Sequence, residues 1–181
     1  MSDVDLLELA GQQHGYFTTT QAKVAGVSRR ALAGRHRKGL IARESHGVYR
    51  LVQYPPTPRD ELYALQVSVP GATFSHDTAL EIYGLSDVLS TTIHLTIPPS
   101  SGLKPRQGVT IHRSNLHPLD RVLRDDIWLT SLPRTLLDCA RLGTDAEQLI
   151  AALQAGRERG LLGGDALARL SSTYPFRNVL R

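Results

Sequence analysis

Residues 17–51 read FTTTQAKVAGVSRRALAGRHRKGLIARESHGVYRL, a stretch that combines two short helical segments with a tight turn between them. The first segment, over 20–25, is followed by Gly26, which favours the left-handed conformation that ends helices. Ser28 is a favourable N-cap for the second segment, over 29–38. Two short helices across a turn that contains glycine are typical of a helix-turn-helix.

The sequence on either side of the two helices extends this pattern. An apolar helical segment precedes them and ends near His14-Gly15. After them, the apolar segments 40–43 and 48–51 flank Glu44-Ser45-His46-Gly47, which predicts a β-hairpin with glycine in its turn. Three helices followed by a hairpin are the order of a winged helix-turn-helix.

The net charge of the chain, +4, is concentrated near its N-terminus. Residues 1–54 carry eight Lys and Arg against four acidic residues, whereas residues 55–181 carry thirteen of each. Within 18–54, all eight cations stand against Glu44 alone. A local excess of +7 predicts a polyanionic partner, of which nucleic acid is the commonest.

The second helix of the pair has two contrasting faces. At 100° per residue, one arc is expected to face the core, and it consists of Val27, Ala31 and Leu32. The opposite arc presents Ala33 between Arg30 and Arg37, so the helix can approach the major groove with guanidinium groups on either side. Arg35 falls on the inward arc, where we expect its stem to pack while its charged end reaches solvent.

Hydroxyl groups, helix N-termini and the cations of the hairpin complete the predicted DNA-binding surface. The predicted contact residues are Thr18, Thr19, Thr20, Ser28, Arg29, Arg30, Ala33, His36, Arg37, Lys38, Arg43, His46 and Arg50. The chain lacks an aromatic stacking platform beside this charge, which favours DNA over RNA.

The segment Tyr54-Pro55-Pro56-Thr57-Pro58 is stiff and unsuited to a sheet interior, so it predicts a domain boundary. We therefore expect a winged helix-turn-helix domain over 1–54, a proline-rich linker over 55–59 and a mixed α/β domain with a small sheet and several helices over 60–181. The expected helices are 59–69, 75–83, a segment that begins near Pro133, 146–159 and 165–170, and the expected strands are 93–97, 109–112 and 127–129. Together they predict an α+β protein.

Catalytic patterns are absent from the sequence. No glutamate is followed two residues later by lysine, as metal-dependent nucleases of the restriction type require. Four histidines of the C-terminal part match no zinc spacing: His76, His94, His112 and His117. The single cysteine, Cys139, lies on an apolar helix face and is expected in the core. We predict no catalytic residue, no metal site and no cofactor. We therefore expect that the protein is not an enzyme.

Nothing in the sequence indicates a membrane or secreted protein. The chain begins with an acidic segment, and no apolar run approaches the ~20 residues of a membrane span. We expect a cytoplasmic protein.

Several motifs resemble those of the AbiEi-type antitoxins, transcriptional regulators of type IV toxin-antitoxin systems. In the N-terminal part they are 17–22, 26–32, 38–41 and 47–50. In the C-terminal part they are Phe74-Ser75-His76-Asp77-Thr78-Ala79-Leu80, Ile93-His94-Leu95-Thr96-Ile97-Pro98, Ile111-His112-Arg113-Ser114 and the run from Thr130 to Asp138. The resemblance therefore extends over nearly the whole chain, although Arg35 stands where related sequences more often place an apolar residue.

The resemblance implies a bacterial autorepressor that also counteracts a nucleotidyltransferase-like toxin without forming a stable complex with it. The N-terminal domain would bind operator DNA, and the C-terminal domain would contribute antitoxicity. Because one winged helix reads a short site, we expect repeated half-sites in the protein's own promoter, bound by a monomer or weak dimer that assembles on DNA. Two alternatives remain open: a metal-dependent nucleic-acid enzyme, and a DNA-binding adaptor whose C-terminal domain docks a protein partner.

Overall fold

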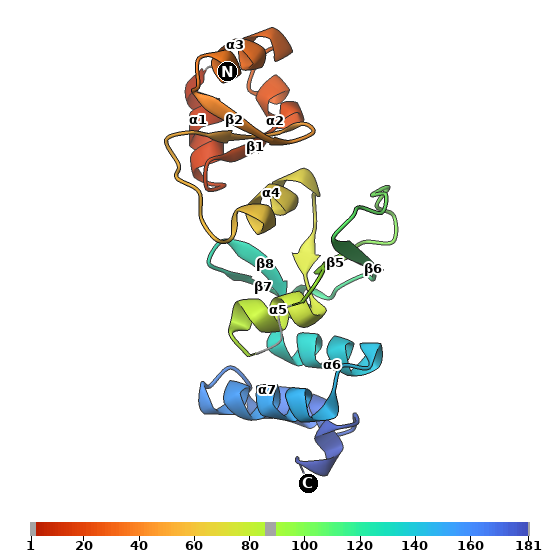
Figure 1. The fold of residues 1–181 in the computed structure, drawn as a ribbon. Helices are drawn as coiled ribbons and strands as arrows, with labels where there is room; N and C mark the ends of the chain where they lie inside the picture. The colour runs from red at the N-terminus through yellow and green to blue at the C-terminus, as the bar shows by residue number, and fades with distance from the viewer. Residues whose placement is uncertain (1–2, 86–89, 181) are drawn as a thin grey trace. The chain divides into compact units, whose positions relative to one another are not determined.

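The computed structural model describes residues 3–85 and 90–180, and it folds as two compact units, 1–70 and 71–181 (Figure 1). Each unit combines helices with one small sheet, so the chain is α+β as predicted. No helix within the described ranges is long and apolar enough to cross a membrane.

The first unit, unit 1, contains the helices and the hairpin expected from the sequence (Figure 1). Its elements are α1 (Asp3–Gly11), β1 (Tyr16–Thr18), α2 (Thr19–Val24), α3 (Arg29–Arg37), β2 (Ile41–Ser45), β3 (Val48–Leu51) and α4 (Asp60–Ser68). The strands form an antiparallel sheet in the order β1-β3-β2, with an irregular register between Arg43 and Ser45. Strand β1 was not predicted, and it ties the start of α2 to the hairpin.

The core of unit 1 lies where the first three helices meet the sheet. Its buried members are Leu6, Ala10, Phe17, Ala22, Ala25, Val27, Leu32, Ile41 and Leu51. The predicted inward arc of α3 is only partly confirmed, because Val27 and Leu32 are buried whereas Ala31 is exposed. The short helix α3 therefore contributes one deeply buried side chain, Leu32, and most of its other side chains are exposed.

The domain boundary differs from the one predicted after Tyr54. Helix α4, which we assigned to the C-terminal domain, belongs to unit 1. Tyr63 of α4 is buried and stacks on His14, with ring centroids 3.9 Å apart, and its ring also packs against Tyr16. The prolines from Pro55 to Pro58 thus form a connection within unit 1, and the boundary follows Pro70.

Gly34 lies in the interior of α3, and a Cβ atom added there would meet nothing within 4 Å. Glycine is unfavourable inside a helix because the unfolded chain loses more conformational freedom on folding. We expect Gly34→Ala to raise the free energy of unfolding of unit 1 by about 0.5–1 kcal/mol. Thermal unfolding of the variant beside the wild type measures the change. A lower midpoint would show that the helix does not tolerate the added methyl group.

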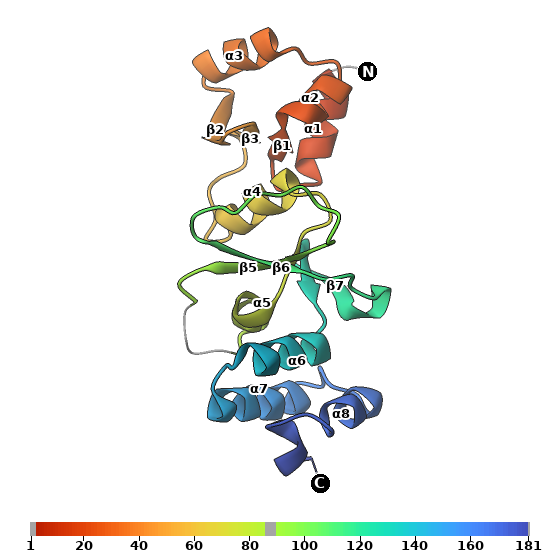
Figure 2. The ribbon, with the colours of Figure 1, turned by 90° about the vertical axis from the view of Figure 1, so that its right-hand side faces the viewer.

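Unit 2 is built on a five-stranded sheet (Figure 2). Its elements are β4 (Thr73–Phe74), α5 (His76–Tyr83), β5 (Ile93–Ile97), β6 (Val109–Arg113), the 3₁₀ turn η1 (Pro118–Asp120), β7 (Arg121–Arg124), β8 (Ile127–Thr130), α6 (Leu132–Leu142), α7 (Ala146–Glu158), α8 (Gly164–Leu170) and the 3₁₀ turn η2 (Phe176–Asn178). The order β6-β5-β4-β8-β7 contains parallel pairs, β5 with β6 and β4 with β8, and antiparallel pairs, β4 with β5 and β7 with β8. The predicted helices and strands are present within a residue or two, whereas β4 and β7 were not predicted.

The register of β5 and β6 positions polar side chains on one face of the sheet. His94 pairs with Thr110 and Thr96 pairs with His112. Because residues two apart on a strand share a face, these four side chains lie on the same side. Helix α5 packs against β5, and its first residue, His76, lies beside this polar patch. The predicted core position of Cys139 is confirmed, since its side chain is fully buried in α6.

Candidate nucleic-acid interface and a histidine cluster

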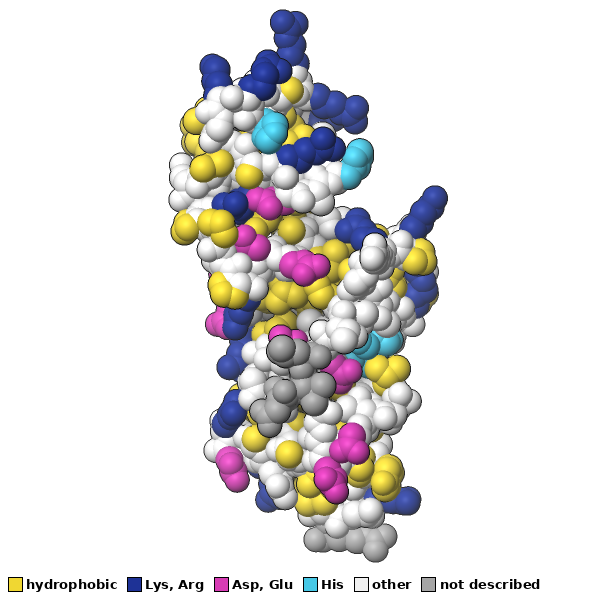
Figure 3. Space-filling model, viewed as in Figure 1, with side chains coloured by type: hydrophobic (Ala, Val, Ile, Leu, Met, Phe, Trp, Pro, Cys, Tyr) yellow, Lys and Arg dark blue, Asp and Glu magenta, His cyan; other side chains and the backbone are white. Residues whose placement is uncertain are grey.

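The outer face of α3 is a cationic surface. The predicted contact residues on this helix and at its end are all exposed: Arg29, Arg30, Ala33, His36, Arg37 and Lys38. Dark blue surface, which marks Lys and Arg, gathers over this helix in Figure 3. Ser28 begins the helix by accepting a hydrogen bond from the amide of Ala31, with an Oγ–N distance of 3.2 Å. The helix is therefore capped at its N-terminus, while Arg29, Arg30 and Arg37 face solvent.

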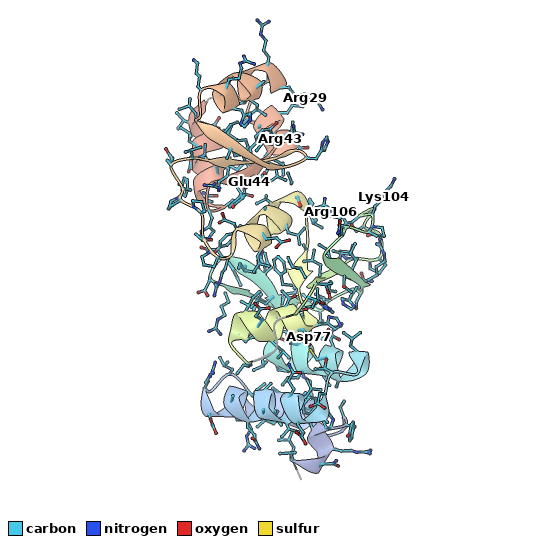
Figure 4. All side chains as sticks on the ribbon, in the orientation of Figure 1. Arg29, Arg43, Glu44, Asp77, Lys104 and Arg106 are labelled. Carbon is cyan, nitrogen blue, oxygen red and sulfur yellow. The ribbon has the colours of Figure 1, made fainter. Side chains whose placement is uncertain are left out.

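The turn of the hairpin is hydrogen-bonded to the N-terminus of α2. The amide of Thr19 donates to the carbonyl of Gly47 at 2.8 Å, and the Thr19 hydroxyl donates to the same oxygen at 3.3 Å. Arg43 and His46, the predicted contact residues on the hairpin, are exposed. Figure 4 labels Arg29 at the start of α3 and Arg43 on β2. The structure thus joins the hairpin and the helix pair through backbone hydrogen bonds.

Arg50 does not fit the predicted surface. Its side chain is buried, with 9% exposure for the residue, and its Nε atom donates to Glu44 Oε1 at 2.8 Å. Its guanidinium also donates to the carbonyl of Tyr54. Arg50 therefore connects the hairpin to the following segment through hydrogen bonds to Glu44 and Tyr54. Because Glu44 pairs with Arg50, the two charges cancel and the local excess of +7 is carried by the other cations.

Two further predicted contact residues already use their polar atoms within the fold. The Thr18 hydroxyl accepts from the amide of Gln21 at 3.1 Å, and the Gln21 side chain accepts from the Thr18 amide in a capping box. His36 Nδ1 lies 3.1 Å from the carbonyl oxygen of Ile41. Thr20, in contrast, is exposed. Thr18 and His36 therefore position α2 and β2, and Thr20 is the more accessible hydroxyl.

Arg35 is half-buried, as its place on the inward arc predicted. Its carbonyl accepts a hydrogen bond from the amide of Leu40 at 3.0 Å, which closes the turn after α3. The backbone of Arg35 thus links α3 to the segment that leads into β2, whereas the side chains of Arg30 and Arg37 are exposed.

Unit 2 contains an ion-pair network that the sequence analysis did not identify. Arg134 Nε donates to Asp138 Oδ2 at 2.7 Å, and its Nη1 donates to Asp120 Oδ2 at 3.3 Å. Its Nη2 also reaches the hydroxyl of Ser114 at 3.4 Å. The Arg134 and Asp138 side chains are only 17% and 7% exposed. The spacing of 134 and 138 on one helix was a visible signal, but Asp120 is distant in sequence.

Three of the four histidines noted in the sequence come together in unit 2. The histidine cluster consists of His76, His94 and His112, and one ring nitrogen from each lies within 4.8 Å of the other two. His94 Nδ1 is 3.0 Å from His112 Nε2, and the rings of His76 and His112 stack with centroids 3.6 Å apart. His117, the fourth, is exposed and caps η1. The spacing gave no signal because a helix start and two strands supply the rings.

Burial favours the neutral form of each ring in the histidine cluster. Burial lowers the pKa of His76 to about 3, and His112, His94 and Arg134 add to this effect. Burial also lowers the pKa of His94 and of His112, while Asp77 opposes the shift at both rings. The three imidazoles therefore keep unprotonated ring nitrogens, which are the form that binds metals.

A protein-family model matches the N-terminal part of the chain. Residues 4–52 match the model described as "Transcriptional regulator, AbiEi antitoxin". This segment is therefore similar to the AbiEi antitoxins. The resemblance seen in the sequence is confirmed for this part of the chain. The AbiEi match includes every residue of the candidate interface from Thr18 to Arg50, and it does not extend to the histidine cluster.

The comparison also extends to solved structures and to curated proteins. The crystal structure of the RV2827C protein from Mycobacterium tuberculosis matches with a TM-score of 0.47 and 15% sequence identity, over 82% of this chain and 69% of that chain. No curated protein matches the chain. The similarity to AbiEi antitoxins thus rests on the segment 4–52.

Proposed function

We propose that the protein is a DNA-binding transcriptional autorepressor whose N-terminal domain is a winged helix-turn-helix. The observation that carries the proposal is the exposed cationic face of α3, next to a hairpin that is hydrogen-bonded to α2. The match of residues 4–52 to AbiEi regulators supports the same function. In this role the protein acts by occupying DNA, and it is not an enzyme.

The geometry supports a defined mode of binding. Helix α3 enters the major groove with Arg30 and Arg37 toward the bases or the flanking phosphates. Ala33 and Gly34 leave room for the helix backbone to approach, since neither carries a long side chain. Arg43 and His46 then lie along the phosphate backbone or the minor groove. We propose that copies of the protein occupy repeated half-sites in the promoter of its own gene and repress it there.

We further propose that the protein is the antitoxin of a type IV system, acts in the cytoplasm and counteracts a nucleotidyltransferase-like toxin without a stable complex. The description of the matched family as AbiEi antitoxin supports this role. Unit 2 is large enough to act separately from the DNA-binding unit, because it has its own sheet and core.

Binding to DNA from immediately upstream of the gene tests the repressor proposal. We expect the full chain to bind this duplex more tightly than a scrambled duplex of equal length, with affinity that falls as salt rises. Fluorescence anisotropy across a salt series measures both affinities. Equal, steeply salt-dependent binding to the two duplexes would contradict an operator-specific repressor, and an absence of binding would contradict a DNA-binding function altogether.

Co-expression with the neighbouring toxin gene tests the antitoxin proposal. We expect the full chain, supplied from an unrelated promoter, to restore growth to cells that express the toxin. The variant Arg37→Ala should restore growth equally well, because its defect concerns DNA. Growth arrest that persists with a well-expressed wild-type chain would contradict the antitoxin role. Co-purification of a stoichiometric toxin would contradict the type IV arrangement.

A further inference from the structure

We propose that the histidine cluster of unit 2 is a binding site for a divalent transition-metal ion of the zinc class. His76, His94 and His112 offer three ring nitrogens within 4.8 Å of one another, and imidazole is a preferred ligand of Zn²⁺. The inference is independent of the function proposed for α3, since the cluster lies entirely in unit 2.

The His94–His112 distance is close to that of a coordination sphere, whereas His76 must move closer. Zinc–nitrogen bonds of about 2.0–2.1 Å in a tetrahedral site place the ligand nitrogens about 3.4 Å apart. The nitrogen–nitrogen distance between His94 and His112 is 3.0 Å, so the pair needs to separate only slightly, and the proton of their hydrogen bond must move to the other ring nitrogen of its histidine. The His76 ring, stacked nearly parallel to His112 at an interplanar angle of 17°, must tilt so that its lone pair points at the same ion.

The surroundings of His76 are those of an oriented metal ligand. Its Nδ1 atom lies 2.9 Å from the hydroxyl oxygen of Ser75, which also accepts a hydrogen bond from Thr96 Oγ1 at 2.8 Å. When Nδ1–H donates to Ser75, the lone pair is on Nε2, the arrangement that second-sphere partners impose on ligating histidines. His76 also has φ of 52°, a left-handed conformation that is uncommon for residues other than glycine.

The charges and exposure of the site also fit a dication. Asp77 and Asp138 interact electrostatically with His112, so negative charge lies close to the cluster. Asp138 is shared with Arg134 and Arg141, and Asp77 accepts weak hydrogen bonds from Cys139 and Thr144. His76 and His94 are buried, whereas His112 on edge strand β6 is half-buried. Metal can therefore enter on the His112 side, and histidine surface is visible beside β6 in Figure 3.

The bound ion would connect three elements of unit 2. His76 belongs to α5, His94 to the inner strand β5 and His112 to the edge strand β6. A ligand that binds only the folded state stabilises it in proportion to the logarithm of its free concentration. We therefore expect the ion to stabilise unit 2 by holding the sheet edge and the helix together, with a fourth coordination position left for water.

The test uses full-length protein stripped of metal with a chelator and then titrated with Co²⁺, a spectroscopic substitute for Zn²⁺. We expect one equivalent of Co²⁺ to give the visible absorption of a four- or five-coordinate ion, and Zn²⁺ to displace it. Zn²⁺ should also raise the unfolding temperature. A wild-type spectrum that stays that of hexa-aqua Co²⁺ would overturn the proposal without any variant.

Variants assign the ligands. His112→Gln can keep a hydrogen bond to His94 but is a poor zinc ligand, so we expect at least tenfold weaker binding with an unchanged metal-free unfolding temperature. Ser75→Ala is expected to weaken binding by about 10- to 100-fold through the second sphere. The matched control is His117→Ala, in the same unit but outside the cluster, which should bind like the wild type. If His112→Gln bound metal as tightly as the wild type, or if His117→Ala lost as much metal affinity as His112→Gln, the assignment of the three histidines as ligands would be overturned.

Discussion

Alanine at position 37 is expected to weaken binding to the upstream DNA by about 1–3 kcal/mol, or roughly 5- to 150-fold. Arg37 is exposed near the C-terminal end of α3, on the same face as Arg30. If its guanidinium group donates to the O6 and N7 atoms of a guanine, the loss falls on the operator and spares random DNA. If it contacts phosphate, affinity for both duplexes falls together and the salt dependence becomes shallower.

The measurement is a titration of both duplexes at fixed salt with wild type, Arg37→Ala and Arg30→Ala. Lys104→Ala is the matched control, because it removes one exposed positive charge from unit 2. We expect that control to bind within twofold of the wild type. Wild-type affinity in both arginine variants would show that α3 is not the DNA-contacting helix. If Lys104→Ala lost as much DNA affinity as Arg37→Ala, the effect would come from the net charge of the protein and not from a contact made by α3.

Arg134→Ala is expected to lower the free energy of unfolding of unit 2 by about 3 kcal/mol. Removal of the guanidinium leaves Asp138 and Asp120, with side chains 7% and 15% exposed, with only the longer contacts to the exposed side chains of Arg141 and Arg169, at 3.5 and 3.8 Å. Breaking a largely buried pair is costly because the remaining charge stays desolvated. Trp128 is the only tryptophan and lies in β8, so its fluorescence during urea unfolding reports on unit 2.

Arg141→Ala is the internal control for this prediction. Arg141 pairs with the same carboxylate group, with Nη1 3.5 Å from Asp138 Oδ1, but its side chain is 68% exposed. Exposed ion pairs contribute little, so we expect a loss of at most about 1 kcal/mol. Similar losses in the two variants would show that burial does not set the strength of this network. An unchanged midpoint in Arg134→Ala would show that Asp138 and Asp120 are stable without it.

The sequence predicted those elements whose ends are set by local chemistry. The bounds of α3 followed from the Ser28 cap and from Gly39 after the helix, and both act within one turn. Strands β4 and β7 were missed for a physical reason. Strand β4 has only two residues, and β7 carries Arg121 and Arg124 at its ends, so neither shows an apolar alternation before its neighbours are known.

The candidate interface was predictable as a charge pattern but not residue by residue. Composition identified the cationic segment, whereas the burial of Arg50 depends on its pairing with Glu44 across the hairpin. The histidine cluster was invisible for the same kind of reason. Parallel pairing of β5 with β6 brings His112 beside His94, and no local spacing encodes which strands become neighbours.

The irregular register between Arg43 and Ser45 affects how one copy of the protein can pair with another, for example on the proposed adjacent DNA sites. Strand β2 is an edge of the three-stranded sheet, and an even edge of this kind invites a strand from another molecule to add to it. A bulge with Arg43 and Glu44 exposed beside it interrupts the row of free backbone groups. If the protein represses its promoter as proposed, neighbouring copies would therefore not join into a continuous sheet, and repression would stay reversible.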